Sequence, residues 1–294
     1  MAGQRDARRH LVGRRAVVAA AAALPLLSIS RAHATEAPIK FALTPVVLDS
    51  SEPFHTLFRS VLERRLGRPV ELVQRRSYQE ITTLLLAGQI DAAWICGYPY
   101  VQFADRLTLL AAPVYKGRPL YQSYLVGSRD RPAASLEELR GDIHAFSDPD
   151  SNSGHLVTRY LLAVQGETPA SFFRETFFTY GHRNVVRAVA AGLADSGSAE
   201  GYVWDVLSEI EPELTEACHV VSKSEWLGWP PITALSTRAD EPQIRGIAEA
   251  LISLEDSEDG RALLDLLRFD RFTAVAPDNY ARIAELSRFV ESQA

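Results

Sequence analysis

The sequence predicts an α/β fold in which parallel strands are covered by helices. Short apolar runs alternate with segments of helical spacing over residues 39–95 and again over residues 143–203, a pattern typical of parallel sheets. In each set a helix ends at a glycine, Gly88 or Gly192, and a short strand with a nearby tryptophan follows. This weak repetition indicates two lobes of similar construction.

The first set of elements has clear boundary signals. Strands are expected at residues 39–43, 70–73 and 92–95. A helix with Pro53 in its first turn stops at Gly67, since proline suits a helix start and glycine a helix end. The next helix begins at Ser77, and Glu80 three residues later completes a capping box. The third strand leads into residues 96–100, whose sequence is Cys-Gly-Tyr-Pro-Tyr.

The rest of the chain repeats the alternation and ends in helices. Extended segments are expected at residues 109–115 and 121–126, and strands at 143–146, 177–180, 200–203, 220–221 and 232–235. Helices are expected at residues 136–139, 156–164, 183–191, 243–254, 260–267 and 279–289. No low-complexity linker separates the two sets, so the chain is expected to cross between lobes at extended segments. We predict one lobe over residues 35–127 and 231–294, and an inserted lobe over residues 128–230.

The first 34 residues read as an export signal. Arg14-Arg15 stands directly before an apolar run at residues 16–27, which is too short to span a bilayer, and Ala32-His33-Ala34 is a small-x-small cleavage site. The arginine pair predicts a twin-arginine signal, with an ordinary secretory signal as the alternative. We expect a mature chain that begins near Thr35, and that is free rather than lipid-tethered because no cysteine stands at the cleavage site.

Charge and cysteine content narrow the function classes. The whole chain has a formal charge of −6, and the export segment holds six Arg and one Asp, so the mature part carries about −11. Such a balance argues against nucleic acid or an anionic membrane as partner. Cys96 and Cys218 are the two cysteines, which is no disulfide framework. They fall in different lobes, where a bridge would oppose hinge motion, so we expect two free, largely buried thiols.

Residues 147–155 are the stretch on which the functional prediction depends. They lie between a strand and a helix, and Ser151, Asn152 or Ser153 can cap that helix. A helix that opens in small hydroxyl residues and Gly154 leaves backbone N–H groups uncovered, and the helix dipole attracts an anion to them. The alternative is an ordinary capped helix in a surface loop.

Residues at the ends of other predicted strands are candidates for the same ligand site. Ligands in open α/β sheets bind at the carboxyl ends of strands. The strand ends here deliver residues 44–45, Tyr78, residues 96–100, 151–155 and 180–182, and Trp204-Asp205. Such a set, shared between two lobes, describes a cleft. Trp226 and Trp229 flank Gly228 before the return crossing and are expected either to line a wall for an organic substituent or to pack in the hinge.

These motifs resemble one known family. Asp148-Pro149-x-Ser151-x-Ser153-Gly154, the helix start at Ser77-Tyr78 with Gly88-x-x-Asp91-x-x-Trp94 after it, and Gly181-His182-x-x-x-x-x-Ala188-Val189 are similar to the periplasmic phosphate, phosphite and phosphonate-binding (PhnD-like) proteins. The resemblance covers residues 38–267. It implies a type-2 periplasmic binding protein with two Rossmann-like lobes, which captures an oxyanion in the periplasm and delivers it to the permease of an ABC importer.

The resemblance also implies the site. Ser151, Ser153 and the amides after them would hold the oxyanion, completed by Tyr78, His182, Asp205 and one of Tyr98 or Tyr100, which cannot both face the cleft if that segment is extended. The ligand-binding residues expected are Tyr78, Tyr98, Tyr100, Ser151, Asn152, Ser153, Gly154, His182 and Asp205. No cofactor and no metal are expected. His182 would be a protonated donor to the anion or else a helix cap. Asp205 would accept a hydrogen bond from a protonated oxygen of the ligand, or else it would cap a helix after the strand that ends at Trp204.

Two alternatives concern Cys96. Some members of this family are similar sensing proteins that bind arsenite through a cysteine, and Cys96 at a strand end suits such metalloid binding and a sensor-kinase partner. Cys96, His182 and Asp205 are also the residue types of a cysteine-nucleophile triad, but they carry no local catalytic signature. We therefore predict a binding protein and not an enzyme.

Overall fold

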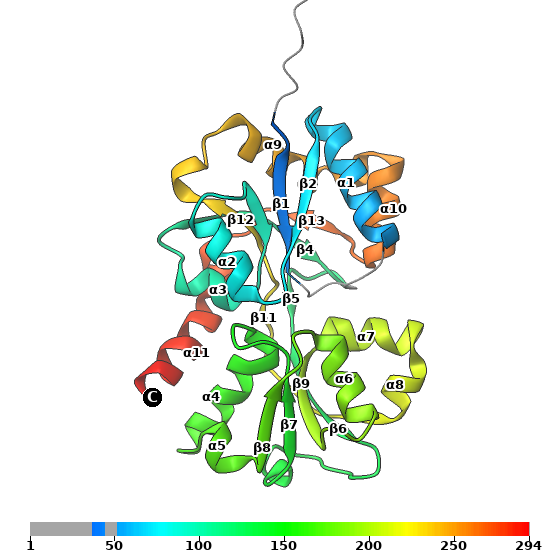
Figure 1. The fold of residues 1–294 in the computed structure, drawn as a ribbon, viewed down its shortest axis with the longest axis vertical. Helices are drawn as coiled ribbons and strands as arrows, with labels where there is room; N and C mark the ends of the chain where they lie inside the picture. Colours follow the sequence, from blue (N-terminus) through cyan, green and yellow to red (C-terminus); the bar gives the residue numbers. More distant parts are fainter. Residues whose placement is uncertain (1–36, 45–51, 294) are drawn as a thin grey trace, which may run out of the picture. The chain divides into compact units, whose positions relative to one another are not determined.

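The computed structural model describes residues 37–44 and 52–293 (Figure 1). The predictions for residues 1–34, namely the export signal, its type and its cleavage site, lie outside the described residues. None of the helices described is long and apolar enough to cross a membrane.

The first sheet has six strands in the order β13-β4-β12-β3-β1-β2. They are β1 (Ile39–Leu43), β2 (Val70–Gln74), β3 (Ala92–Trp94), β4 (Leu107–Val114), β12 (Ile232–Leu235) and β13 (Arg271–Thr273). β1 runs parallel to β2 and β3, as predicted, whereas β12 is antiparallel to β3 and β4. The sheet is therefore mixed rather than purely parallel, because the chain returns to it from the second sheet.

Helices pack around this first sheet (Figure 1). They are α1 (Glu52–Leu66), α2 (Tyr78–Leu86), α3 (Gly97–Gln102), α9 (Pro242–Ile252) and α10 (Glu258–Leu267), with short 3₁₀ turns at Ser236–Arg238, Leu254–Asp256 and Pro277–Tyr280. The last helix, α11 (Ala281–Ser292), packs against α3 and lies beside the helices of the second sheet instead (Figure 1). The predicted capping box of α2 is confirmed: Ser77 accepts from the Glu80 amide, and the Glu80 carboxylate accepts from the Ser77 amide.

The second sheet has five strands in the order β10-β6-β9-β7-β8. They are β6 (Ser123–Ser128), β7 (Ile143–Phe146), β8 (Glu175–Phe178), β9 (Ser196–Glu200) and β10 (Cys218–Lys223), with helices α4 (Val157–Val164), α5 (Pro169–Phe172), α6 (His182–Ala190), α7 (Gly201–Ile210) and α8 (Pro212–Glu216) and a 3₁₀ turn at Glu137–Leu139. β7 is parallel to β8 and β9, and β6 is antiparallel to β9 and β10.

Two short strands lie between the sheets. β5 (Leu120–Tyr121) pairs antiparallel with β11 (Leu227–Gly228), and Figure 1 shows this pair between the first sheet with its helices and the second sheet with its helices. We propose that the chain crosses between its two lobes at β5 and β11.

Two local predictions are wrong. Residues 200–203 are not a strand: β9 ends at Glu200, and α7 begins at Gly201. The apolar side chains of Tyr202, Val203, Val206 and Leu207 form the buried face of that helix instead. Strand β9 was not predicted because its residues are small and give no apolar signal. Close packing requires small residues here, since a Cβ on Gly197 would lie 2.5 Å from Val185 Cγ1 and 3.0 Å from the Ala145 carbonyl oxygen. Residues 97–102 are likewise a helix, α3, and not an extended turn.

Replacing Ser77 with alanine is expected to lower the free energy of unfolding by about 1 kcal/mol, because the side-chain half of the capping box is lost. For a protein of this size this is a fall of about 2–4 °C in melting temperature, measurable by circular dichroism. The matched control is Ser60→Ala in α1, whose hydroxyl donates to the Leu57 carbonyl within the helix and whose loss is expected to change stability by less than ~0.5 kcal/mol. Equal melting temperatures for both variants would contradict the cap assignment.

Candidate functional site

The predicted helix start forms the β7–α4 turn, residues 147–156. Ser151 caps it, with its hydroxyl accepting from the Gly154 amide at 3.0 Å. One turn of π-helix, Asn152–Leu156, leads from this cap into α4. The turn closes tightly because the Ser147 amide donates to the Gly154 carbonyl at 3.2 Å. Ser151, Asn152, Ser153 and Gly154 are all buried, which is unusual for the polar start of a helix.

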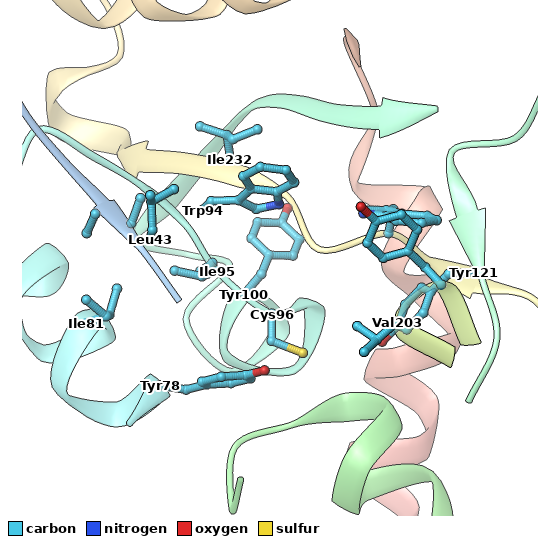
Figure 2. Close-up of a cluster of buried hydrophobic side chains, with 14 of the residues drawn as sticks. Leu43, Tyr78, Ile81, Trp94, Ile95, Cys96, Tyr100, Tyr121, Val203 and Ile232 are labelled. Atoms are coloured by element: carbon cyan, nitrogen blue, oxygen red, sulfur yellow. The ribbon is translucent and has the colours of Figure 1, made fainter. Parts of the chain in front are cut away.

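Elements of the first sheet reach this turn. The Tyr78 amide, at the first position of α2, donates to the Asp148 carboxylate at 3.2 Å. The backbone N–H of Asn152 donates to the Cys96 sulfur at 3.2 Å. Figure 2 shows the Tyr78 hydroxyl and the Cys96 sulfur facing the green ribbon of the second sheet's helices. The turn is therefore enclosed by residues from both sheets, as a cleft between two lobes requires.

His182 and Glu200 form a buried pair beside the turn. His182 opens α6 and Glu200 ends β9. The Glu200 amide donates to His182 Nδ1 at 3.1 Å, and His182 Nε2 lies 3.4 Å from the Tyr78 hydroxyl and 3.6 Å from Glu200 Oε2. Because Nδ1 accepts, the proton of a neutral His182 is on Nε2, where it points toward these two oxygens.

Burial decides the charge states of this pair. Burial lowers the pKa of His182 to about 3 and raises the pKa of Glu200 to about 8, since a low-dielectric interior disfavours the charged form of each group. At neutral pH these shifts favour the uncharged form of both side chains. A protonated His182, expected from the sequence when an anion is bound, stays a prediction that needs the ligand's charge to offset burial.

Four side-chain atoms in this region are buried and lack a hydrogen-bond partner within the described part of the chain. They are Ser147 Oγ, Asn152 Oδ1, Ser153 Oγ and Glu200 Oε1, on residues that are at most 1% exposed. The side-chain nitrogen of Asn152, Nδ2, does have a partner, because it donates to the Tyr121 hydroxyl at 2.8 Å. Unpaired buried polar atoms cost free energy, so their concentration beside one helix start indicates a polar ligand.

The structure brings together six of the nine residues predicted from the sequence. Tyr78, Ser151, Asn152, Ser153, Gly154 and His182 gather at the β7–α4 turn through the contacts described above. Tyr98, Tyr100 and Asp205 have other surroundings. Tyr100 packs edge-on against Tyr280, with ring centroids 4.8 Å apart. Tyr98 is also buried on α3, and burial raises its pKa.

Asp205 is not the helix cap that the sequence suggested. It lies within α7, where its carboxylate accepts from Lys116 Nζ at 2.7 Å and from the Tyr115 hydroxyl at 3.2 Å. Both donors bind the same oxygen, Asp205 Oδ2, so the other carboxylate oxygen keeps its acceptor capacity. The wrong strand assignment for residues 200–203 is the reason that Asp205 was placed at a helix start.

Sequence reasoning missed Asp148, Glu200 and Tyr121 as parts of the site. Asp148 belongs to the motif, but its contact with the Tyr78 amide depends on how the two sheets meet. Glu200 is the last residue of β9, after the small residues Ser196 to Ala199. An acidic residue directly after a run of small residues was the one sequence signal that could have indicated it. Tyr121 had no signal beyond its place in a predicted crossing.

No group of three His, Cys, Asp or Glu side chains that could hold a metal ion occurs in residues 37–44 and 52–293. Cys96 and Cys218 are both free and buried, which confirms the expectation of two unbridged thiols. Burial raises the pKa of Cys96 to about 12, so its sulfur is a thiol at neutral pH.

An enclosed helix start with unpaired hydroxyl and amide groups, between two α/β sheets joined by two crossings, defines a solute-binding protein of the periplasmic binding class. The chain belongs to the family described as the periplasmic substrate-binding protein of phosphonate ABC transporters, whose model matches residues 49–280. The chain is thus a periplasmic substrate-binding component of an ABC transport system, and the predicted family and fold class are confirmed.

Individual relatives agree with this assignment. The phosphonates-binding periplasmic protein of Escherichia coli is 26% identical over 276 residues, covering 91% of this chain and 81% of the relative. The phosphate-import protein PhnD of Mycolicibacterium smegmatis is 30% identical over 151 residues, 47% of each chain.

Solved structures show the same fold. The binding protein component of an ABC phosphonate transporter from Pseudomonas aeruginosa superposes with a TM-score of 0.78 at 22% identity over 87% of each chain. PhnD1 of Prochlorococcus marinus in complex with methylphosphonate superposes with a TM-score of 0.75 at 18% identity, covering 86% of this chain and 98% of the other.

Proposed function

We propose that this protein captures a small phosphorus oxyanion, a phosphonate, phosphite or phosphate, at the β7–α4 turn and delivers it to the permease of an ABC importer. The observation that carries the proposal is the set of unpaired buried oxygens that can donate a proton, Ser147 Oγ, Ser153 Oγ and Glu200 Oε1, beside one helix start; the unpaired Asn152 Oδ1 can accept from a protonated oxygen of the ligand. The names of the Escherichia coli and Mycolicibacterium smegmatis relatives support the ligand class.

The donors proposed for the anion are neutral. Ser153 and Ser147 can each donate a hydroxyl proton, and Glu200, protonated at neutral pH, can donate from its unpaired oxygen. His182 can donate from Nε2, and the start of the helix adds its dipole. An anion here gains hydrogen bonds to its charged oxygens, which are stronger than bonds between neutral groups.

Binding would be linked to lobe closure because both sheets contribute to the site. Tyr78 and Cys96 come from elements of the first sheet, and Ser153 and His182 from elements of the second. A ligand held by both favours the closed form, and we propose that the closed form is what the permease recognises. Export through the predicted signal, with cleavage near Ala34, belongs to the same proposal.

Cys96 supports a second candidate, in which the protein senses a soft metalloid such as arsenite and signals to a sensor kinase. Its sulfur lies at the turn, 3.2 Å from the Asn152 amide. Against this candidate, a thiol whose pKa is about 12 must lose its proton before it binds a metalloid.

The test is a thermal-shift and calorimetry panel with phosphate, phosphite, methylphosphonate, sulfate and arsenite. A phosphorus oxyanion at ~100 times its dissociation constant is expected to stabilise the protein by ~2.7 kcal/mol. Ser153→Ala is expected to weaken binding by roughly 10- to 100-fold, the loss of one hydrogen bond to a charged group. The unliganded melting temperature should change little, because that hydroxyl has no partner within the described residues.

Two further outcomes would contradict the importer proposal. One is the absence of any shift with every phosphorus oxyanion. The other is a shift with arsenite alone that Cys96→Ser abolishes, which would establish the metalloid ligand of the sensing candidate.

A further inference from the structure

A pocket of about 360 Å³ opens next to the crossing strands. It is lined by segments on both sides of β5 and β11 and by the first turns of α7. Six aromatic rings line it: Tyr115, Tyr121, Tyr124, Tyr202, Trp226 and Trp229. Trp229 is buried and lies 5.3 to 5.7 Å, centroid to centroid, from the rings of Tyr115, Tyr121 and Tyr202. Trp226 is 46% exposed and therefore lies at the rim.

This aromatic pocket adjoins the oxyanion site through two residues. The Tyr121 hydroxyl accepts from the Asn152 side chain at the β7–α4 turn, while its ring lines the pocket. Gly201 also lines the pocket and directly follows Glu200. A Cβ on Gly201 would lie 2.6 Å from the Tyr124 ring, so this stretch of the wall has no room for a side chain.

Three of the polar groups that line the pocket pair with one another. Asp205 accepts from Lys116 and from the Tyr115 hydroxyl. Two ammonium groups lie over the rings, Lys116 at 4.8 Å from the Tyr115 centroid and Lys223 at 4.4 Å from the Tyr124 centroid. A cationic substituent would meet these two charges and an acid that is already paired. A flat, uncharged ring meets aromatic faces and edges, which favour it.

We propose that the aromatic pocket holds the organic substituent of the ligand, so that this protein prefers oxyanions that carry a planar aromatic group over those with a methyl or aminoalkyl group. The inference rests on the proposed function, because it places the oxyanion at the β7–α4 turn. It assigns Trp226 and Trp229 to ligand selection, with Trp229 as the inner wall and Trp226 as the rim.

The experiment compares benzylphosphonate, methylphosphonate and 2-aminoethylphosphonate by isothermal titration calorimetry on the purified protein. Benzylphosphonate is expected to bind about tenfold more tightly than the other two, the gain of one or two aromatic contacts. Trp226→Ala should bring the ratio of benzyl to methyl affinity toward one, and its exposed position keeps the fold intact. Leu193→Ala removes another exposed apolar side chain outside the pocket and should leave the ratio unchanged.

The outcomes separate this inference from the function on which it rests. Methylphosphonate binding with no advantage for benzylphosphonate, or tightest binding of 2-aminoethylphosphonate, overturns the aromatic subsite and leaves the oxyanion site standing. A benzyl preference that is undiminished in Trp226→Ala also overturns it. If none of the three binds the wild-type protein but phosphate or phosphite does, the aromatic subsite is overturned and the oxyanion site stands; if no phosphorus oxyanion binds, the proposed function itself fails.

Discussion

Replacing Gly154 with alanine is expected to lower the free energy of unfolding by about 1–3 kcal/mol, the range for overpacking a close-packed interior, and to abolish oxyanion binding. The added Cβ would overlap Ser147 Oγ, and it would lie 2.6 Å from Ser147 Cβ and 3.0 Å from His182 Cε1. Either the turn or His182 must move, and both are parts of the proposed site. Gly154 is required here for space and not for an unusual backbone conformation, since it is not among the residues with positive φ.

Chemical denaturation and calorimetry measure the two effects. The control is Gly246→Ala in α9, where the nearest atom to the new Cβ, Leu66 Cδ2, is 3.3 Å away at the end of a flexible side chain. That variant should bind like the wild type. Adding Ser147→Gly to Gly154→Ala removes the overlapping atoms and should restore part of the lost stability. A Gly154→Ala protein with wild-type stability and affinity would show that the turn is looser than described.

Oxyanion affinity is expected to fall about tenfold for each pH unit above 8, because the protonated fraction of Glu200 falls by that factor above its pKa of about 8. An ionised Glu200 would repel the anion that its neutral form binds. The groups that face Glu200 do not compete for this titration: burial raises the pKa values of Tyr78 and Tyr121 well above their usual range and that of Cys96 to about 12, and His182 is neutral. Burial also raises the pKa of the Asp148 carboxyl, and the Glu200→Gln comparison below separates its titration from that of Glu200.

The matched variant is Glu200→Gln, which keeps the shape and cannot ionise. Dividing the dissociation constant of the wild type by that of Glu200→Gln at each pH from 7 to 9.5 cancels the titration of the ligand. The ratio should rise steadily above pH 8, and a flat ratio would show that Glu200 does not touch the anion.

The same group affects stability with a defined sign. The folded pKa of Glu200 is raised above the unfolded value of 4.5. Folding therefore takes up a proton between pH 4.5 and about 8, and stability falls across that window as pH rises. The slope is at most about 1.4 kcal/mol per pH unit, and it levels off above pH 8. Glu200→Gln should lack this contribution.

Local signals in the sequence predicted much of the fold and part of the site. The capping box at Ser77 and the strand at Ile39–Leu43 were placed correctly because neighbouring residues determine them. The turn at residues 151–154 was predicted for the same reason, since the capping residues that indicate a helix start lie within the turn itself. The α7 helix was misplaced because Tyr202 and Val203 suit a strand as well as a helix, and the small residues of β9 gave no apolar signal.

The remaining features depend on contacts between distant segments. The role proposed for Glu200 as an uncharged acid depends on the burial of the end of β9, and no local pattern indicates how deeply a strand end is buried. The same holds for Tyr121, whose hydroxyl meets Asn152, 31 positions further along the chain. The surroundings of Asp205 also depend on distant segments, because its partners Tyr115 and Lys116 are about 90 residues away; its role as a ligand residue stays a prediction.

The bond from the Tyr78 amide to the Asp148 carboxylate has a kinetic consequence. It joins the two halves of the molecule without help from any solute, as do the Arg282 contacts of α11, which packs against α4. If the solute leaves by the lobe opening proposed above, these bonds must break as well as those of the solute. We therefore expect slow release, even of a solute that itself makes few contacts.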